Sequence, residues 1–297
     1  MASTSKSSRS RNNSKKNFRL DPEARARIEA EYSAVADDYS NYDIPEKPKK
    51  KRVWLRKLIV RVVLLSIAVI MVNIAILFFT GQLWFNEPRK RDYPVRGPVI
   101  TEKQGKVNWE KFAAQNIQMA YIRATKSTAY VDESFRKNKS GSAETALPVG
   151  MLHIFDISMD GKEQAEHFIK TVGGQRGNLI PAVEVGYTGF YRVLPPDDED
   201  VAQRLRAFAD CIISEYGVSP VIKCSEKTYS RLLDSHGFDD CYIWIESEYS
   251  KVDESIEWDF WGYSSRVKFE YYEDKGFLEM VLFKGSEEEF EEYFVVQ

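Results

Sequence analysis

The sequence predicts an α/β protein, an irregular barrel of eight strands that follows a single transmembrane helix and a disordered N-terminal segment. Three observations predict this order: a polar, basic beginning, a long apolar run at residues 62–79, and a later alternation of strand-like and helix-like segments. With 297 residues, of which 43% are hydrophobic and 13% aromatic, the chain can bury a large core.

Residues 1–52 are expected to form a disordered, basic, cytoplasmic segment. Their Ser, Asn, Lys and Arg residues bury too little apolar surface to offset the entropy lost on ordering. Within this segment, residues 21–31 predict a short helix with Asp21 as N-cap and Pro22 at the first position. Residues 1–57 carry a charge of +7 in a chain of net charge −3, so the remainder carries −10. The two parts are therefore suited to different surroundings.

Residues 58–80 are predicted to span a membrane. The core of this segment, residues 62–79, contains only Ser66 and Asn73 as polar interruptions, and about 20 apolar residues suffice to cross hydrocarbon. Trp54 and Trp84 flank it, where amphipathic rings favour the interface. A buried core helix would be shorter or amphipathic, and a cleaved signal peptide would lack the long polar segment in front.

The charges beside the span predict its orientation. Eight cations lie between Lys47 and Arg61, against five between Arg89 and Lys103, which favours a cytoplasmic N-terminus in the cell membrane. The C-terminal domain is then periplasmic or extracellular. The basic run at residues 47–52 has two readings, a topology determinant or a site of attraction for anionic lipid, and both can hold together.

A charged linker is expected at residues 81–94, and a folded domain at residues 95–297. Strand-like runs occupy residues 95–100, 119–124, 149–155, 180–185, 219–224, 242–245, 259–264, 267–272 and 277–283. Helix-like segments occupy residues 109–115, 133–146, 162–171, 198–215 and 226–234, and an acidic helix starts at Ser286. Alternating strands and helices predict a parallel sheet, and the strands near the C-terminus complete an irregular barrel.

An ordered series of short motifs runs through this domain. It comprises Arg96-Gly97, Gln104-Gly105-Lys106-Val107-Asn108-Trp109, Tyr121-Ile122-Arg123-Ala124-Thr125, Tyr130 to Asn138, Ala146-Leu147-Pro148-Val149-Gly150, His153, Pro181, Trp244-Ile245, Tyr249, Trp258, Trp261-Gly262-Tyr263 and Phe283-Lys284-Gly285-Ser286. With this series the domain resembles glycoside hydrolase family 25, the Chalaropsis-type lysozymes. The resemblance implies a (β/α)5(β)3 TIM-like barrel and, in active members, cleavage of peptidoglycan after N-acetylmuramic acid.

The same resemblance implies catalytic carboxylates at the C-terminal ends of the strands. The family's first-strand Asp falls on Val99, its Asp-x-Glu pair on Glu184 and Gly186, and its last Asp on Glu279. Other positions differ too: the family's Tyr before His is Leu152, its Thr-Glu-Gly is Thr125-Lys126-Ser127, and its Trp-Gln-Tyr is Trp261-Gly262-Tyr263.

These differences remove the chemistry that glycoside cleavage needs. A protonated carboxyl must protonate the leaving oxygen, and the acid position is Gly186. Residues i and i+2 of a strand lie about 6.6 Å apart, so Glu184 does not cover the gap by being one bond of about 1.5 Å longer than Asp. Loss of general acid catalysis alone costs about 10²–10⁴ in rate.

Three functions remain open. The first is a catalytically inactive, membrane-anchored module that binds peptidoglycan or a protein partner. The second is an active muramidase that uses Glu184 and Glu279, and the third is a structural domain whose cleft is filled. Tyr121, His153, Trp261 and Tyr263 are the candidate glycan-binding residues, although such barrel aromatics are more often core and such a histidine is more often hydrogen-bonded structure.

Other chemistries have little support in the sequence. Cys211, Cys224 and Cys241 are odd in number and lack metal-ligand spacing, so we expect no metal and no cofactor, and one disulfide is left open. The Gly-rich run 173–177 follows a helical stretch and predicts a loop. The acidic outer domain argues against nucleic acid. The identity of the ligand and the oligomeric state stay open.

Overall fold

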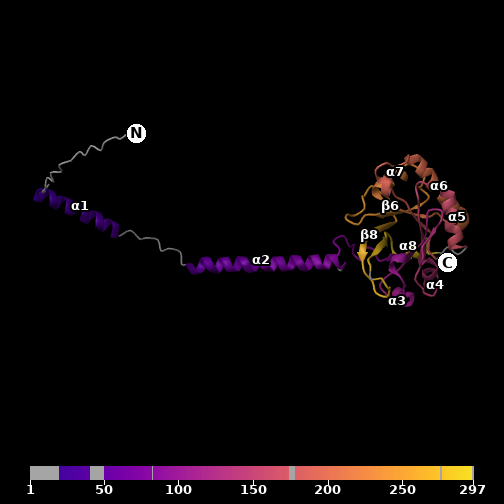
Figure 1. Ribbon diagram of the computed structural model, residues 1–297, viewed down its shortest axis with the longest axis horizontal. Helices are drawn as coiled ribbons and strands as arrows, with labels where there is room; N and C mark the ends of the chain where they lie inside the picture. The colour runs from indigo at the N-terminus through magenta and orange to yellow at the C-terminus, as the bar shows by residue number, and fades with distance from the viewer. Residues whose placement is uncertain (1–19, 41–49, 82, 174–177, 275, 296–297) are drawn as a thin grey trace, which may run out of the picture. The chain divides into compact units, whose positions relative to one another are not determined.

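The computed structural model describes residues 20–40, 50–81, 83–173, 178–274 and 276–295. The chain divides into two units, Met1–Ala68 and Val69–Gln297 (Figure 1). In the first unit, α1 (Pro22–Ser40) extends beyond the short helix predicted at residues 21–31, and none of its residues is buried. Most of the remaining segment that we predicted to be disordered, residues 1–19 and 41–49, lies outside the described residues. Residues 174–177 of the predicted Gly-rich loop also lie outside them.

Helix α2 (Lys50–Phe79) contains the predicted span. Its segment Arg52–Phe79 is long and apolar enough to cross a membrane, and none of it is buried within the structure. Ser66 and Asn73 bond the carbonyls four residues before them, Val62 O at 2.9 Å and Val69 O at 2.8 Å. An apolar helix of this length without protein packing is suited to hydrocarbon rather than to water.

Eight strands close the barrel, which confirms the predicted fold class. They are β1 (Arg96–Ile100), β2 (Ala120–Lys126), β4 (Val149–Ile154), β5 (Ala182–Glu184), β6 (Val221–Ser225), β7 (Tyr242–Glu246), β8 (Phe260–Val267) and β9 (Leu278–Phe283). Neighbours from β1 to β8 pair in parallel, and β9 pairs antiparallel with β8 and β1 to complete the ring. The short β3 (Tyr130–Val131) adds to β2.

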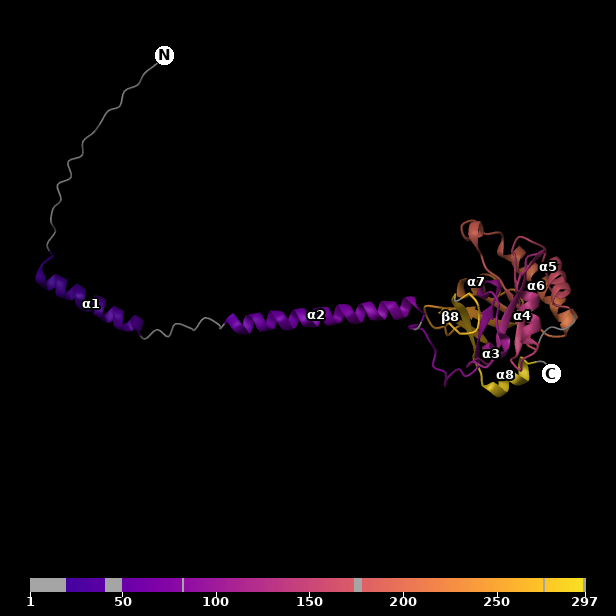
Figure 2. The same cartoon turned by 60° about the horizontal axis from the view of Figure 1, so that its bottom comes forward.

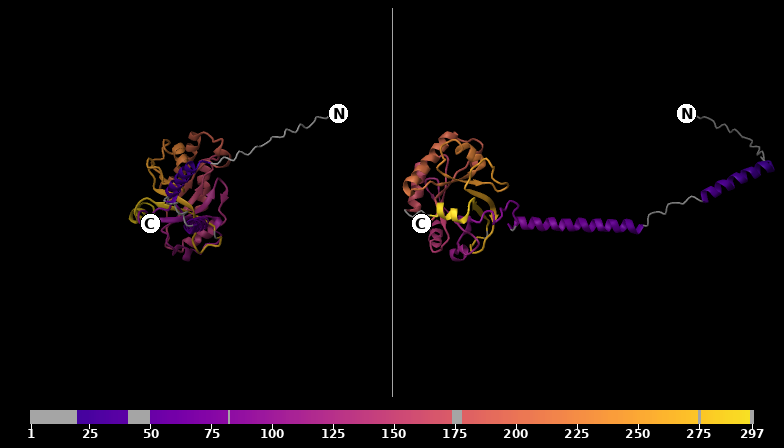
Figure 3. Two further views of the ribbon diagram at one scale, coloured as in Figure 1. Left: turned by 90° about the vertical axis from the view of Figure 1, so that its left-hand side faces the viewer. Right: turned by 180° about the vertical axis from the view of Figure 1, so that it is seen from behind.

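Helices surround this ring, as the view from behind in Figure 3 shows. They are α3 (Trp109–Ala113), α4 (Phe135–Ser142), α5 (Gly161–Val172), α6 (Asp198–Tyr216), α7 (Glu226–Leu232) and α8 (Glu287–Tyr293), with 3-10 turns η1 (Glu102–Gln104) and η2 (Gly189–Arg192). Four of these helices begin with a side-chain N-cap. The side chains of Asp160, Asp197, Ser225 and Ser286 each accept a backbone N–H of the helix that follows.

The separate strand predicted at residues 267–272 is wrong. Strand β8 continues to Val267, and in the connection to β9 the described residues, 268–274 and 276–277, form only an isolated bridge, from Tyr272 to Val107. Tyr271 has φ of 71°, in the left-handed region, which is incompatible with an extended strand. The apolar and aromatic composition of this segment instead serves packing against α3, where Phe269 and Tyr272 contact the ring of Phe112.

The barrel has an inner and an outer core. Inside the ring, Tyr121, Trp244 and Phe260 fill the space between strands. Phe290 of α8 and Phe294, the residue that caps this helix, join this cluster and cover one end of the barrel, where Figure 2 shows α8. Outward-facing strand residues pack against the surrounding helices in a larger cluster. Because both faces of each strand are buried, polar residues in the strands must find partners within the protein.

The segment after α2 is fastened to the barrel. Trp84, which we expected at the membrane interface, is buried: its Nε1 donates to Tyr263 O at 3.0 Å, and its ring stacks on Phe78 at 5.6 Å. Asn86 Nδ2 lies 2.8–3.2 Å from three carbonyl oxygens, those of Ser247, Glu248 and Ser250. These bonds hold residues 84–86 against the C-terminal ends of β7 and β8.

Replacing Gly161 with Ala is expected to destabilise the fold by about 1–3 kcal/mol. A Cβ at Gly161 would lie 1.7 Å from the backbone oxygen of Arg204, so α5 and α6 would have to separate. Urea denaturation of the full chain in detergent measures the effect. Gly186→Ala is the matched control, because its Cβ meets no atom within 4 Å. Equal stability of the two variants would contradict the close helix contact.

Candidate functional site

A buried lysine forms the centre of the site. Lys223 lies on β6 and only 1% of it is exposed. It shares the inner face of the barrel with Val221, two residues before it, and is in register with Glu184 on β5. A buried ammonium is stable only when it is paired, so this position predicts carboxylates on the neighbouring strands.

Three carboxylates from three strands meet the Lys223 ammonium. Its Nζ lies 2.7 Å from Glu184 Oε2, 3.0 Å from Glu246 Oε1 and 2.7 Å from Glu279 Oε1. The same nitrogen is 5.1 Å from the centre of the Trp244 ring. The structure thus brings together the two predicted acids, Glu184 and Glu279, and adds Glu246, which the sequence analysis did not single out.

The cluster has more negative than positive groups, and this sets its protonation. Burial raises the pKa of Glu279 from 4.5 to about 8, and the neighbouring Glu246 and Glu184 add to the rise that Lys223 opposes. Burial alone would lower the pKa of the Lys223 ammonium, but the three carboxylates outweigh it and hold that pKa well above its usual value. Lys223 is therefore a permanent cation and not an amine nucleophile.

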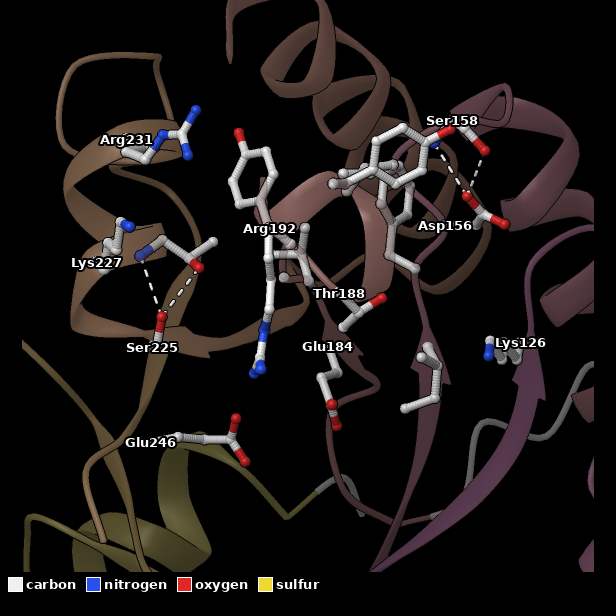
Figure 4. Close-up of a pocket in the computed structure, with 18 of the residues that line it drawn as sticks. Lys126, Asp156, Ser158, Glu184, Thr188, Arg192, Ser225, Lys227, Arg231 and Glu246 are labelled. Carbon is white, nitrogen blue, oxygen red and sulfur yellow. Dashed lines mark hydrogen bonds between the residues drawn. The ribbon is translucent and has the colours of Figure 1, made fainter. Parts of the chain in front are cut away.

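A pocket of about 790 Å³ lies over the C-terminal ends of β4 to β7. Glu184 and Glu246 line it, whereas Lys223 and Glu279 lie outside its lining. Figure 4 shows Arg192 directed toward the space where Glu184 and Glu246 also point. Because ligand sites of α/β barrels lie at this end of the strands, this pocket is the candidate binding site, and its cleft is open rather than filled.

The loop between β5 and α6 forms one wall of the pocket. Tyr187, Phe190 and Tyr191 line it, and 68% of Phe190 is exposed. The hydroxyl of Tyr187 donates to Asp198, and the guanidinium of Arg231 lies 4.1 Å from the centre of the Tyr187 ring. This wall offers aromatic faces held by α6 and α7, of the kind on which sugar rings can pack.

Two glycines shape the pocket. Gly186 lines it, and a Cβ there would meet no atom within 4 Å, so this position is open space. At Gly262, a Cβ would lie 3.1 Å from Trp244 Nε1 and 3.5 Å from Glu246 Cγ. The missing side chain at Gly262 therefore makes room for Trp244 and Glu246. Val99, the other position that lacks a carboxylate, is 5% exposed and pairs in register with Glu279.

The four predicted glycan-binding residues offer no surface for a sugar. Tyr121 and His153 are 0% exposed, Tyr263 is 2% and Trp261 is 3% exposed. Tyr121 lies inside the barrel, where its hydroxyl donates to Ile180 O at 3.3 Å. Trp261 Nε1 donates to Ser247 O at 2.9 Å. In this structure these rings are core, and the exposed aromatics of the pocket are those of the β5–α6 loop.

His153 points outward from the barrel toward the helices. Its Nδ1 lies 2.7 Å from Thr125 Oγ1 and its Nε2 lies 3.3 Å from Gln164 Oε1, while its ring stacks on Phe208 at 5.0 Å. Burial lowers its pKa to about 4, so the imidazole is neutral at pH 7. It accepts from the Thr125 hydroxyl and donates to Gln164. These contacts give it a structural role between β4 and α5.

The part of the chain that the structure describes shows neither a cluster of metal-ligand side chains nor a disulfide. There, no group of three or more His, Cys, Asp and Glu residues is arranged to hold a metal ion. The three glutamates that converge have the Lys223 ammonium at their common centre. Cys211, Cys224 and Cys241 are free thiols, so the disulfide left open by the sequence is not formed among them.

Comparisons with known proteins agree with this architecture. The sequence profile of glycosyl hydrolases family 25 matches residues 100–271. The structure of a family 25 glycosyl hydrolase from Bacillus anthracis superposes with a TM-score of 0.65 and 29% identity, over 70% of this chain and 96% of that one. The autolytic lysozyme of Clostridium acetobutylicum is 25% identical over 202 residues, 68% of this chain and 57% of that protein. The uncharacterized protein YegX of Escherichia coli O157:H7 is 24% identical over 208 residues, 68% of this chain and 74% of its own length.

Lys223→Met is expected to destabilise the fold by about 3–5 kcal/mol at pH 8, because it leaves three carboxylates without their cation. At pH 5 the loss is expected to be smaller, since the carboxylates then take up protons more readily. Urea denaturation of the full chain in detergent at the two pH values measures it. Lys227→Met is the control, because Lys227 is exposed on the same pocket. A loss independent of pH would argue against the charge cluster.

Glu279→Gln is expected to flatten the dependence of stability on pH. The folded chain holds the Glu279 proton up to a pKa of about 8, whereas the ordinary value is 4.5. The folded state thus binds a proton that the unfolded state has lost, and stability falls as pH rises from 4.5 to 8. Unfolding free energies at pH 5, 6.5 and 8 should show this fall in the unmodified chain and in the surface control Glu254→Gln, and less of it in Glu279→Gln. If the unfolding free energy fell equally with pH in all three proteins, a group other than Glu279 would account for the fall.

Proposed function

Because the chain belongs to glycosyl hydrolases family 25, we propose that it is a membrane-anchored lysozyme-like domain that binds peptidoglycan glycan without cleaving it. The observation that carries this proposal is Gly186. It occupies the family's acid position, it lines the pocket, and the space beside it is open. A glycan can enter where a family member would hold its proton donor, but it meets no acid there.

The remaining acids of the pocket are poorly suited to replace that donor. Glu184 and Glu246 line the pocket, but each has an oxygen at the Lys223 ammonium. Burial raises the pKa of Glu279 to about 8, yet Glu279 lies outside the pocket lining. A general acid must reach the leaving oxygen within about 2.6–3.2 Å or through one water. The acid whose pKa is raised is thus not one of the acids that line the pocket.

An active muramidase that uses Glu184 and Glu279 is the alternative. It is favoured by their convergence on one nitrogen and by the proton on Glu279. Glu246 offers a further partner for Glu184. Their two bonded oxygens lie 2.7 and 3.0 Å from the same nitrogen, so the two carboxylates are close enough to act on one bond. The Lys223 ammonium between them is what disfavours this reading.

The β5–α6 loop supplies the proposed binding surface. Phe190 and Tyr191 face the pocket beside the open position of Gly186. Aromatic rings pack on the apolar faces of sugars, and Arg192, directed into the pocket, can donate to glycan oxygens or carboxylates. Peptidoglycan is the ligand class that the family and the autolytic relative suggest.

Anchoring follows from α2. An apolar helix of this length, preceded by the basic residues 47–52, supports a single membrane span with contacts to lipid headgroups. The flanking charges favour a cytoplasmic N-terminus and a barrel outside the cell membrane. This topology would hold the binding domain where cell-wall glycan is found.

Two assays on the full chain in detergent test the proposal. The chain should sediment with purified peptidoglycan and should not lower the turbidity of a cell-wall suspension. Phe190→Ala is expected to weaken binding about threefold to tenfold, the effect of one aromatic contact. Val193→Ala is the matched control, because Val193 is 85% exposed on the same loop but does not line the pocket.

The outcomes separate the two functions. Turbidity loss that Glu184→Gln abolishes would establish the muramidase and refute the inactive module. Absence of sedimentation, or equal binding by Phe190→Ala and unmodified chain, would exclude the glycan site. Gly186→Glu adds a gain test: a Cβ at this position meets no atom within 4 Å, and new turnover in that variant alone would support loss of the acid as the cause of inactivity.

A further inference from the structure

We propose that the transmembrane helix carries a polar seam through which two copies of this chain pair in parallel. The seam consists of Ser66, Asn73 and Thr80, which follow one another at intervals of seven residues. This inference rests on the membrane anchoring proposed above and is independent of the barrel's activity.

Helix geometry places the seam on one face. Seven residues fall about 20° short of two full turns, so residues at this spacing form a nearly straight stripe. Helix α2 is continuous from Lys50 to Phe79, and Thr80 still donates its N–H to Ile76 O at 2.8 Å, as in a helix. A slight left-handed crossing of two helices keeps such a stripe at their contact.

Asn73 is the group that needs a partner. Its Nδ2 donates to Val69 O at 2.8 Å, and this is its only side-chain hydrogen bond among the described residues. An amide side chain has a second N–H and a carbonyl oxygen. Asn73 lies about 9 Å along the helix from Phe79, inside the apolar segment, where lipid tails offer neither donor nor acceptor. Leaving these groups unpaired in hydrocarbon is costly.

The two hydroxyls of the seam differ from Asn73. Ser66 Oγ donates to Val62 O at 2.9 Å and Thr80 Oγ1 donates to Ile76 O at 2.8 Å, so their hydrogens are satisfied within the helix. Their oxygens can still accept, and their small size lets a second helix approach. The seam therefore has one side chain that needs a hydrogen-bond partner, Asn73, between two that do not.

A second copy of the same chain satisfies this pattern. All copies share one topology, so their spans are parallel, and in register each Asn73 faces its counterpart across a two-fold axis. An amide is both donor and acceptor, which lets two asparagines bond each other reciprocally. Ser66 then faces Ser66 and Thr80 faces Thr80. The opposite face of α2, with Ala68 and Ala75, is small but holds no unpaired polar group.

Cysteine cross-linking in membranes tests the seam. Ile70→Cys and Leu77→Cys, close to the seam, are expected to give a disulfide dimer of twice the chain mass. Ala68→Cys and Ala75→Cys, on the opposite face, are expected to give little. The chain without added cysteine is the background control, because Cys224 and Cys241 are buried and only Cys211 is partly exposed.

Asn73→Leu in the Leu77→Cys chain is expected to lower the association constant about threefold to thirtyfold, the range for a hydrogen bond between membrane helices. Met71→Leu, on the other face, should leave the association constant unchanged.

Three results would each overturn the seam: a dimer formed through Ala75→Cys, a cross-linked product of another mass, or full dimerisation of Asn73→Leu. Alkaline extraction of the same membranes separates this failure from that of anchoring: a chain released to the soluble fraction refutes the span itself, whereas an integrated, monomeric chain refutes only the pairing.

Discussion

The barrel depends on one buried cation. Lys223 is almost fully covered, and a charge in that position is tolerated only because β5, β7 and β9 each bring a glutamate to its nitrogen. The cluster ties together strands that are not all neighbours in the sheet. The residue on one strand also limits the residues allowed on the next. A side chain at Gly262 of β8 would press on Trp244 and reach Glu246, both on β7.

This arrangement underlies the function proposed above. Three glutamates at the C-terminal strand ends surround an internal ammonium. The position beside them at Gly186, where the resemblance to the family places its acid, is open space. In the proposed function, both features change the chemistry of the pocket and leave its shape intact. A site can therefore keep its capacity to hold a glycan after the groups that would cleave it have been lost or redirected.

Much of the fold could be predicted from the sequence. The candidate span followed from a long apolar run with only two polar residues, and the barrel from regular alternation of strands and helices. The prediction of a strand at residues 267–272 failed because the aromatic composition suits strands, whereas Tyr271 has a left-handed φ and its carbonyl accepts the N–H of Asn108, the N-cap of α3. Local composition carries no information about a single left-handed residue.

The site was only partly predictable. Resemblance located Glu184 and Glu279, but Lys223 and Glu246 lie within strands that looked like core, and their pairing depends on which face each strand turns inward. In strands buried on both sides, both faces carry apolar residues, so the sequence does not show which residues face the inside of the barrel. For the same reason His153 could not be assigned to the helix-facing layer from its sequence neighbours. The lysine in an otherwise apolar strand was the one signal that pointed to buried carboxylates.

The attachment of residues 84–86 to the barrel has a mechanical meaning. Trp84 is bonded to Tyr263 of β8 and Asn86 to the loop after β7, and only four residues lie between Phe79 and Trp84. Such a segment extends at most about 17 Å. In the proposed function, where α2 spans a bilayer and the pocket binds a wall polymer, a pull on that polymer would reach the lipid through a connection no longer than this. The tether length, and not only the affinity of the pocket, would then limit how far from the membrane the glycan is held.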